Sequence, residues 1–220
     1  MRIGIIGAGN IGGTLTRRLT ALGHDVYVAN SRGPETLGGL AEESGATAAT
    51  ARDAVRDAEL VVITIPEKAI PQLDAQILEA RADGAPIVDT GNYYPGRDGR
   101  IAEIEEGTPE SVWVAEQTGH RVIKAFNNIY AGHLLELGRP AEEEGRIALP
   151  VAGDDPQAKA VVMRLVDELG FDPVDAGGLD ESWRQQPGSP CYAADLDAEQ
   201  LREALAAASP ERPAEFRATG

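Results

Sequence analysis

The chain has 220 residues, one cysteine and a formal net charge of -16 at pH 7. This length allows one large domain, or one domain with a small addition. The negative charge argues against binding to nucleic acid or to anionic membranes, since both attract basic surfaces. No segment approaches the roughly 18 to 20 apolar residues of a membrane span. Cys191 has no second cysteine to pair with, and we expect a cytoplasmic protein without a leader segment.

The N-terminal residues predict a strand, a glycine turn and a helix. Residues 3–6 form a short apolar run, and the turn Gly7-Ala8-Gly9-Asn10-Ile11-Gly12 follows it. Apolar residues then recur at helical spacing up to Leu22, and a second strand begins at Val26. A strand–turn–helix–strand unit of about 30 residues is the context in which the pattern Gly-x-Gly-x-x-Gly binds a dinucleotide.

Each glycine of this turn has an expected role. Gly7 permits the tight turn, Gly9 lets the backbone approach the pyrophosphate, and Gly12 lets the helix pack closely on the strand. The helix start at Asn10 and Ile11 then points its free N–H groups toward the phosphates. The alternative interpretation is a glycine-rich turn that serves packing alone.

The second strand ends with Asn30-Ser31-Arg32, where such folds distinguish NADP from NAD. An acidic residue there would hydrogen-bond a free ribose 2'-hydroxyl. This chain has an amide, a hydroxyl and a guanidinium instead. Because a guanidinium can hold a phosphate through two parallel hydrogen bonds, the pattern favours NADP(H) over NAD(H). The alternative is that Arg32 is an ordinary surface arginine.

Further apolar runs predict strands and helices in alternation. Strands are expected at 46–48, 60–65, 86–89, 122–126, 147–152 and 171–174. Helices are expected at 34–43, 51–56, 70–78, 133–137, 155–169 and 195–208. This alternation predicts an α/β fold of the Rossmann type, with a doubly wound, mainly parallel sheet and a small α/β C-terminal part. We expect an NADP-binding unit at 1–104, a smaller part at 105–208 and a flexible tail at 209–220.

Open parallel sheets bind ligands at the carboxyl ends of their strands. The residues that follow the predicted strands on this edge are therefore candidate contacts to NADP(H). With the turn and the second strand end, the candidates are Gly7, Gly9, Asn10, Ile11, Gly12, Asn30, Ser31, Arg32, Thr64, Ile65, Pro66, Gly91, Asn92 and Asn127.

Three residues are weak candidates for a catalytic role. His133 is a candidate proton donor, and Tyr93 is a candidate, with Tyr94, for stacking on a flat substrate. Lys124 lies on a predicted strand beside the expected cofactor face. The alternatives are a histidine at the surface or in packing, and a lysine paired with an acid. No two histidines have the spacing of metal ligands, so we expect no metal site.

The segment Arg121-Val122-Ile123-Lys124-Ala125-Phe126-Asn127-Asn128-Ile129-Tyr130-Ala131 resembles the V-K-A-F-N-x-x-[SY]-A segment of NADP-dependent deazaflavin (coenzyme factor-420) oxidoreductases. The cytosolic reductase domains of six-transmembrane metalloreductases share it. Residues 151–159 and 169–177 are similar to the C-terminal half of these proteins, and the resemblance covers roughly residues 1–180. It implies NADP(H) over the sheet edge, a flavin-like ring beside the nicotinamide, and direct hydride transfer that depends on positioning.

The chain departs from the family pattern where an acceptor would bind. Family members commonly have an Asn-Pro pair after the fifth strand, whereas this chain has Gly91-Asn92-Tyr93-Tyr94-Pro95. Residues 179–192 are also unlike the deazaflavin enzymes. Within that segment, Trp183, Arg184 and Tyr192 either close a pocket or form a dimer contact. Because tryptophan and arginine are common at interfaces, we expect a homodimer.

The expected function is hydride transfer between NADPH and a small-molecule acceptor, either a flavin, a deazaflavin, or a small carbonyl or imine. One alternative is a non-catalytic NADP(H)-binding redox sensor. Another is a metalloreductase relative that lacks the membrane domain.

Overall fold

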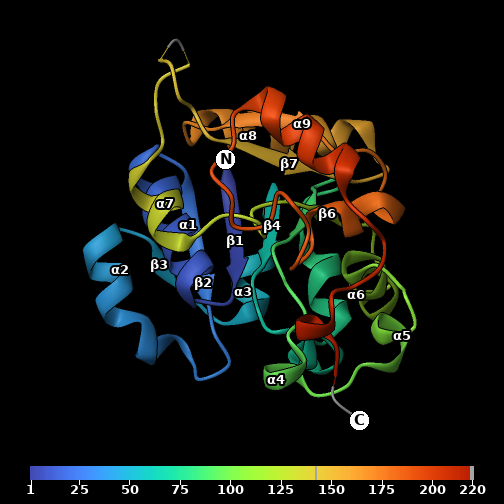
Figure 1. Cartoon of the computed structure of the whole chain (residues 1–220). Helices are drawn as coiled ribbons and strands as arrows, with labels where there is room; N and C mark the ends of the chain where they lie inside the picture. The colour runs from blue at the N-terminus through green and yellow to red at the C-terminus, as the bar shows by residue number, and fades with distance from the viewer. Residues whose placement is uncertain (142, 219–220) are drawn as a thin grey trace.

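The computed structural model describes residues 1–141 and 143–218 (Figure 1). Within them, parallel strands form a six-stranded sheet in the order β3-β2-β1-β4-β5-β6. The strands are β1 (Arg2–Ile6), β2 (Asp25–Ala29), β3 (Thr47–Ala48), β4 (Leu60–Ile63), β5 (Ile87–Asp89) and β6 (Ile123–Lys124). This is the strand order of dinucleotide-binding folds, and it reverses direction between β1 and β4. The predicted Rossmann-type α/β fold is confirmed.

The C-terminal part has a small sheet of its own. β7 (Ala148–Val151) and β8 (Asp172–Asp175) pair in parallel, and α8 (Pro156–Glu168) connects them. An antiparallel bridge between Lys124 and Ala152 links this pair to β6 of the large sheet. The large sheet therefore continues past residue 104, the expected end of the NADP-binding unit.

Helices flank both faces of the large sheet. Beside α8, the α-helices are α1 (Asn10–Ala21), α2 (Gly38–Ser44), α3 (Ala51–Val55), α4 (Pro95–Asp98), α5 (Ala102–Glu105), α6 (Glu110–Thr118), α7 (Ala131–Glu136) and α9 (Ala198–Ala207). Short 3₁₀ helices are η1 (Pro34–Leu37), η2 (Glu67–Gln72), η3 (Ala75–Ala80), η4 (Leu179–Gln185) and η5 (Ala214–Phe216). None of these described helices has the length and apolar character needed to cross a membrane.

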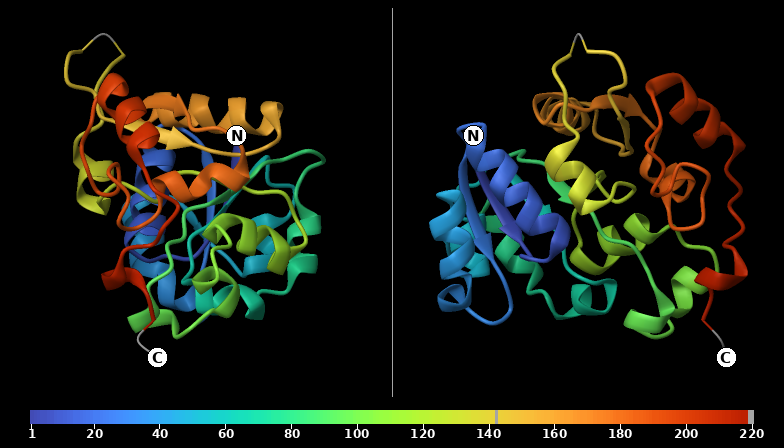
Figure 2. Two further views of the ribbon diagram at one scale, coloured as in Figure 1. Left: turned by 45° about the vertical axis from the view of Figure 1, so that its right-hand side comes forward. Right: turned by 60° about the vertical axis from the view of Figure 1, so that its left-hand side comes forward.

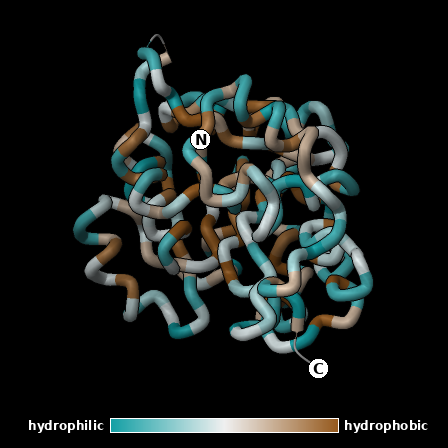
Figure 3. The backbone as a smooth tube through the Cα atoms, viewed as in Figure 1, coloured by the Kyte–Doolittle hydropathy of each residue, from teal (hydrophilic) through white to brown (hydrophobic). Residues whose placement is uncertain are grey.

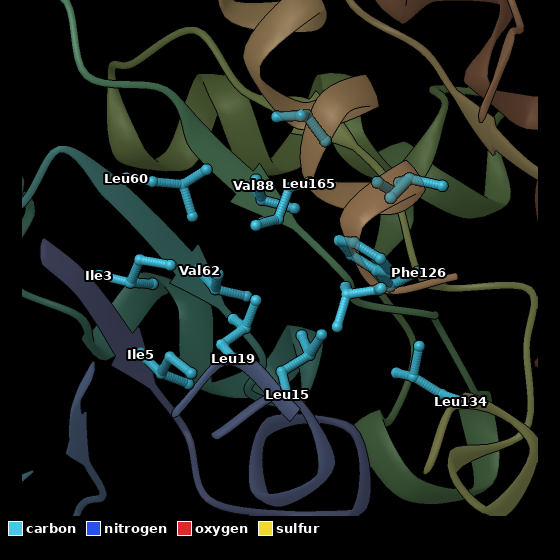
Figure 4. Packing of buried hydrophobic residues seen from close by; sticks show 14 of the residues in the cluster. Ile3, Ile5, Leu15, Leu19, Leu60, Val62, Val88, Phe126, Leu134 and Leu165 are labelled. Atoms are coloured by element: carbon cyan, nitrogen blue, oxygen red, sulfur yellow. The ribbon is translucent and has the colours of Figure 1, made fainter. Parts of the chain in front are cut away.

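Successive residues of the central strands pack on opposite faces of the sheet, as strand geometry requires. On one face, Val62 belongs to a buried cluster with Leu19 of α1 and Leu165 of α8 (Figure 4). On the other face, Val61 packs in a cluster with Trp113 of α6. The strands in the middle of the molecule accordingly carry hydrophobic colours (Figure 3). A strand buried on both faces reads as an unbroken apolar run, which is why residues 60–65 were recognisable.

Several elements differ from the sequence prediction, among them α4 and α5, which were not expected as helices. The helix expected at 70–78 is wrong, because the chain there forms η2 and η3. Pro71 lies inside η2, where it has no N–H to donate to a continuing α-helix. Helix α6 was not predicted at all, although its buried Trp113 completes one face of the core.

The segment expected to be a flexible tail makes specific contacts over its described residues, 209–218. Arg212 forms an ion pair of 2.6 Å with the buried Glu110 of α6. The backbone N–H of Ala218 donates a hydrogen bond of 2.8 Å to Glu105 of α5. Residues 219–220 of the expected tail lie outside the described residues.

Candidate functional site

The glycine turn joins β1 to α1 at the carboxyl edge of the large sheet. Gly7 has a positive φ of 114° and donates its N–H to the carbonyl of Ala29 at 2.8 Å. A Cβ on Gly7 would overlap the backbone of Thr64, and a Cβ on Gly12 would overlap the carbonyl oxygen of Gly7. Both positions therefore have no room for a side chain.

Gly9 has a different environment from the other two glycines. A Cβ built on Gly9 would meet no atom within 4 Å. Gly9 is the N-cap of α1, no side chain caps this helix, and its first turn contains no acidic residue. The free N–H groups and the positive end of the helix dipole are therefore available to an anion, and Gly9 keeps the approach clear.

The end of β2 presents Arg32 next to this turn. The side-chain oxygen of Asn30 accepts the backbone N–H of Arg32 at 2.9 Å, and its amide donates to the Thr36 hydroxyl at 2.9 Å. Ser31 and Arg32 are exposed. The guanidinium of Arg32 forms no hydrogen bond or ion pair within the part of the chain that the structure describes. The hydrogen bonds of Asn30 thus hold the backbone of this turn in place, while the side chain of Arg32 has no partner among the described residues.

Two cavities lie along this edge of the sheet. The Arg32 cavity has a volume of about 480 Å³ and lies between the glycine turn, the end of β2 and the residues after β4. The Tyr192 cavity has a volume of about 350 Å³ and lies between the start of α1 and the residues after β4, β5 and β6. Gly9 and residues 64–66 line both cavities, so the two share a wall.

The predicted NADP(H) contacts gather around these two cavities. The residues that line at least one of them are Gly7, Gly9, Asn10, Ile11, Asn30, Ser31, Arg32, Thr64, Ile65, Pro66, Gly91, Asn92 and Asn127. Gly12 does not line either cavity, because it packs against Gly7. The topology therefore brings residues that follow five strands (β1, β2, β4, β5 and β6) to one place.

Amide side chains connect the ends of β5 and β6 to η4. The Asn127 amide donates to the side-chain oxygen of Asn92 at 3.0 Å and to the carbonyl of Gln185 at 2.6 Å. Asn92 donates to the carbonyl of Asn127 at 2.8 Å, and Gln185 donates to the Asn127 side-chain oxygen at 2.9 Å. Asn127 is thus a structural junction as well as part of the wall of the Tyr192 cavity.

The residue before this junction has an unusual backbone. Phe126 is fully buried and has a φ of 61°, a conformation that costs energy for a residue with a side chain. Its ring packs in the same cluster as Leu134 and Leu165 (Figure 4). Burial of the ring offsets the backbone cost, and the turn directs Asn127 toward Asn92. This gives the Lys-Ala-Phe-Asn segment a physical role.

Lys124 is fully buried on β6 and is paired with an acid. Its ammonium donates to the carbonyl of Gly91 at 2.6 Å and lies 3.3 Å from a carboxylate oxygen of Asp89. Burial lowers the pKa of Lys124, but Asp89, Glu110 and Glu67 outweigh it, so that the pKa is raised overall. The charged amine therefore holds Gly91, which lines the Tyr192 cavity, from behind.

Glu67 is a buried carboxyl directly behind the same wall. One oxygen accepts from Arg97 at 2.8 Å, and the other has no hydrogen-bond partner within residues 1–141 and 143–218 and lies against Gly91. Burial, followed by repulsion from Glu110 and Asp89, raises the pKa of Glu67 well above its ordinary value.

Glu110 lies at the start of α6 and is fully buried. One carboxylate oxygen is 2.6 Å from Arg212, and the other is 4.0 Å from the ammonium of Lys124. Burial raises the pKa of Glu110, and the two cations partly offset that rise. The acidic and basic groups behind the cavity thus form one connected cluster. Lys124 was a candidate from the sequence, but its partners come from distant segments and carry no local signal.

The other two weak catalytic candidates lie outside the cavity lining. Tyr93 is fully buried, and its hydroxyl donates toward Gly99 at 3.0 Å and Glu105 at 2.8 Å. The Nδ1 atom of His133, on α7, lies 2.8 Å from a carboxylate oxygen of Asp195. In this structure neither side chain is part of the wall around the Tyr192 cavity.

Three tyrosines line the Tyr192 cavity instead: Tyr94, Tyr130 and Tyr192. The hydroxyls of Tyr94 and Tyr192 are in contact. Burial raises the pKa of both, so both keep their protons at neutral pH. Arg97 lines the same cavity, and its guanidinium lies 5.1 Å from the centre of the Tyr94 ring. Tyr192, for which a pocket role and a dimer contact were both left open, lines this cavity.

We expect Glu67→Gln to reduce the pH dependence of stability. The folded protein holds the Glu67 proton to a higher pH than the unfolded chain, so this contribution is complete at low pH and is lost as the pH rises through the raised pKa. The free energy of unfolding, measured with urea, should fall between pH 5 and pH 8 in the wild type. This fall should exceed that of the variant by roughly 1 kcal/mol or more. Glu116→Gln, at an exposed position on α6, is the control. Equal decreases in all three proteins would contradict the assignment.

Comparison with known proteins identifies the N-terminal part. Residues 2–93 match the family described as "NADP oxidoreductase coenzyme F420-dependent". The chain is 28% identical to the F420-dependent NADP reductase of Methanothermobacter thermautotrophicus, over 83% of each chain. It is 48% identical to the Escherichia coli protein YjhV over 66 residues, which are 30% of this chain and 48% of that protein. It is 27% identical to the metalloreductase STEAP3 of Rattus norvegicus, over 81% of this chain and 34% of that protein.

A solved structure covers nearly the whole chain. The crystal structure of the hypothetical protein SMa0349 from Sinorhizobium meliloti has 31% sequence identity and a TM-score of 0.75, and the match covers 89% of this chain and 95% of that one. The resemblance noted in the sequence is confirmed by the family match over residues 2–93 and by the similarity to the F420-dependent NADP reductase. The N-terminal part matches the family of coenzyme F420-dependent NADP oxidoreductases, and the chain as a whole is similar to one such reductase and to part of a metalloreductase.

Proposed function

We propose that this chain is an oxidoreductase that binds NADP(H) across the Arg32 and Tyr192 cavities and transfers hydride to or from a flat acceptor in the Tyr192 cavity. The observation that carries the proposal is the wall shared by the two cavities, formed by Gly9 and residues 64–66. It lies at the reversal of strand order, where folds of this type bind dinucleotides.

The residues at one end of this site fit the phosphates of NADP(H). The uncapped start of α1 and the open space at Gly9 suit the pyrophosphate. Arg32 has a cationic side chain without a partner within the described residues, and no acid stands at this strand end to bind a free 2'-hydroxyl. Arg32 and Ser31 would hold a ribose 2'-phosphate there.

The residues at the other end fit a planar acceptor. When bound, NADPH supplies a hydride, and the protein has to hold two rings face to face and exclude water. Tyr94, Tyr130 and Tyr192 provide aromatic surface for an acceptor, and Asn127 and Gly91 line the same cavity. An acceptor of the flavin or deazaflavin class fits this aromatic wall better than a small carbonyl or imine. The homodimer and the cytoplasmic location stay predictions.

The acceptor class is tested by NADPH oxidation at 340 nm with the purified protein. We expect oxidation with coenzyme F420 or with FMN, and little with a small imine such as 1-pyrroline. Preference for the imine would contradict the planar-acceptor proposal. Binding of NADPH without oxidation by any of these acceptors would favour the redox-sensor alternative.

Arg32→Ala should weaken NADPH binding selectively. A hydrogen-bonded charge pair is worth about 1.5–3 kcal/mol, so the Kd for NADPH should rise by roughly 10- to 100-fold. The Kd for NADH, which lacks the 2'-phosphate, should stay nearly the same. Fluorescence titration of both nucleotides gives the comparison, with the exposed Arg164→Ala as the control for general charge loss. An equal effect on NADPH and NADH would refute the 2'-phosphate assignment.

Gly9→Val should abolish NADP(H) binding while the protein stays folded. The side chain would occupy open space, so it meets no protein atom but blocks the approach to the start of α1. Circular dichroism melting checks the fold, and fluorescence titration measures binding. Gly39→Ala is the matched control, because a Cβ at this exposed position on α2 also meets nothing within 4 Å. Normal NADPH affinity in the Gly9 variant would show that the turn serves packing alone.

A further inference from the structure

The C-terminal segment returns to the acceptor end of the site. We call residues 209–218 the C-terminal strap. After α9, the strap runs along the side of the molecule and places η5 beside α4, as both Figure 1 and Figure 2 show. Arg212 anchors it to Glu110 at 2.6 Å, and its guanidinium lies 5.2 Å from the centre of the Tyr93 ring. The strap is therefore attached to the segment that precedes Tyr94.

The strap also packs tightly on the loop that leads to Tyr192. Gly188 has a φ of 86°, and a Cβ there would lie 2.7 Å from the Pro213 ring and 2.9 Å from the Phe216 ring. No side chain fits between this loop and the strap. The strap thus contacts both segments that carry the paired tyrosines.

Phe216 lies directly against those tyrosines. Its ring centre is 6.5 Å from the ring of Tyr94 and 6.5 Å from the ring of Tyr192, at interplanar angles of 48° and 76°. Tilted and edge-on arrangements of this kind are favourable between aromatic rings. Tyr94 and Tyr192 line the Tyr192 cavity, but Phe216 does not. Phe216 therefore supports the cavity wall from outside.

We propose that Phe216 is a positioning residue, and that the C-terminal strap holds the Tyr94–Tyr192 pair in the orientation that shapes the acceptor end of the Tyr192 cavity. The identity of the ligand in this inference rests on the proposed function, whereas the contacts of Phe216 are seen in the structure. The two tyrosines are 98 positions apart in the chain. Without a third ring behind them, each has alternative side-chain rotamers, and an acceptor would have to order them on binding.

The anchors of the C-terminal strap lie outside the Arg32 cavity. Its anchors are Glu110, Glu105, Gly188 and the two tyrosines, whereas the Arg32 cavity is built from the glycine turn and the ends of β2 and β4. A change in Phe216 should therefore separate acceptor binding from NADPH binding. A defect in folding would affect both.

The test compares Phe216→Ala with the wild type in the full-length chain. We expect the KM for FMN or coenzyme F420 to rise by about tenfold and the Kd for NADPH to stay within about twofold. Phe216→Leu, which retains apolar bulk, should recover part of the loss. Glu215→Ala, an exposed neighbour on the strap, should behave as the wild type. An unchanged KM in a folded Phe216→Ala protein would overturn the proposal.

A second measurement does not depend on any acceptor. Tyrosine ionisation, followed by absorbance at 295 nm, reports on the burial that raises the pKa of Tyr94 and Tyr192. In Phe216→Ala, part of this titration should move to lower pH, and in Glu215→Ala it should not. An unchanged titration would overturn the proposal even if the wild type oxidised no NADPH with these acceptors. If the wild type oxidised no NADPH with these acceptors, the proposed function would be rejected. The role of the C-terminal strap would then be tested by the tyrosine titration.

Discussion

The close approach of α1 to the ends of β1 and β4 is the constraint on which the rest of the site depends. The carbonyl of Gly7 occupies the space that a Cβ on Gly12 would need. In the same way, the backbone of Thr64 occupies the space that a Cβ on Gly7 would need. Because neither glycine has a Cβ, the helix start reaches the sheet edge. Residues 64–66 then lie beside Gly9 and form the wall that both cavities share. With any larger residue, the helix would have to move away from that wall.

A second constraint lies behind the Tyr192 cavity. Glu67, Asp89 and Glu110 are buried together with Lys124, and Arg97 and Arg212 approach from the surface. Burying charged groups costs free energy because they lose their contact with water. Pairing each charge with an opposite one offsets part of this cost. The pairing ties β5, β6, α6 and the C-terminal strap to one another. The polar cluster and the aromatic pair Tyr94–Tyr192 thus belong to one assembly, built from segments that are far apart in the sequence.

Much of the fold follows from local patterns, and its exceptions have local causes. The apolar run at 60–65 predicts a central strand because both of its faces are covered. At the start of α9, Asp197 caps the helix by accepting the backbone N–H groups of Glu199 and Gln200. Aspartate is a residue type that favours a helix start. The helix expected at 70–78 contains Pro71 and breaks into two 3₁₀ helices. Helix α6 has no strong apolar periodicity, and its burial becomes clear only when α6 packs on the sheet.

The residues that line the Arg32 cavity could be predicted in large part from the sequence alone. The glycine turn, the helix start and the Asn30-Ser31-Arg32 strand end act through contacts among neighbouring residues, so their spacing is visible in the chain. How the wall of the Tyr192 cavity is assembled is visible only in the tertiary structure. Tyr94, Tyr130 and Tyr192 come from three separate segments, and Phe216 comes from a fourth. Their meeting depends on the packing of the whole fold, and no local pattern carries that information.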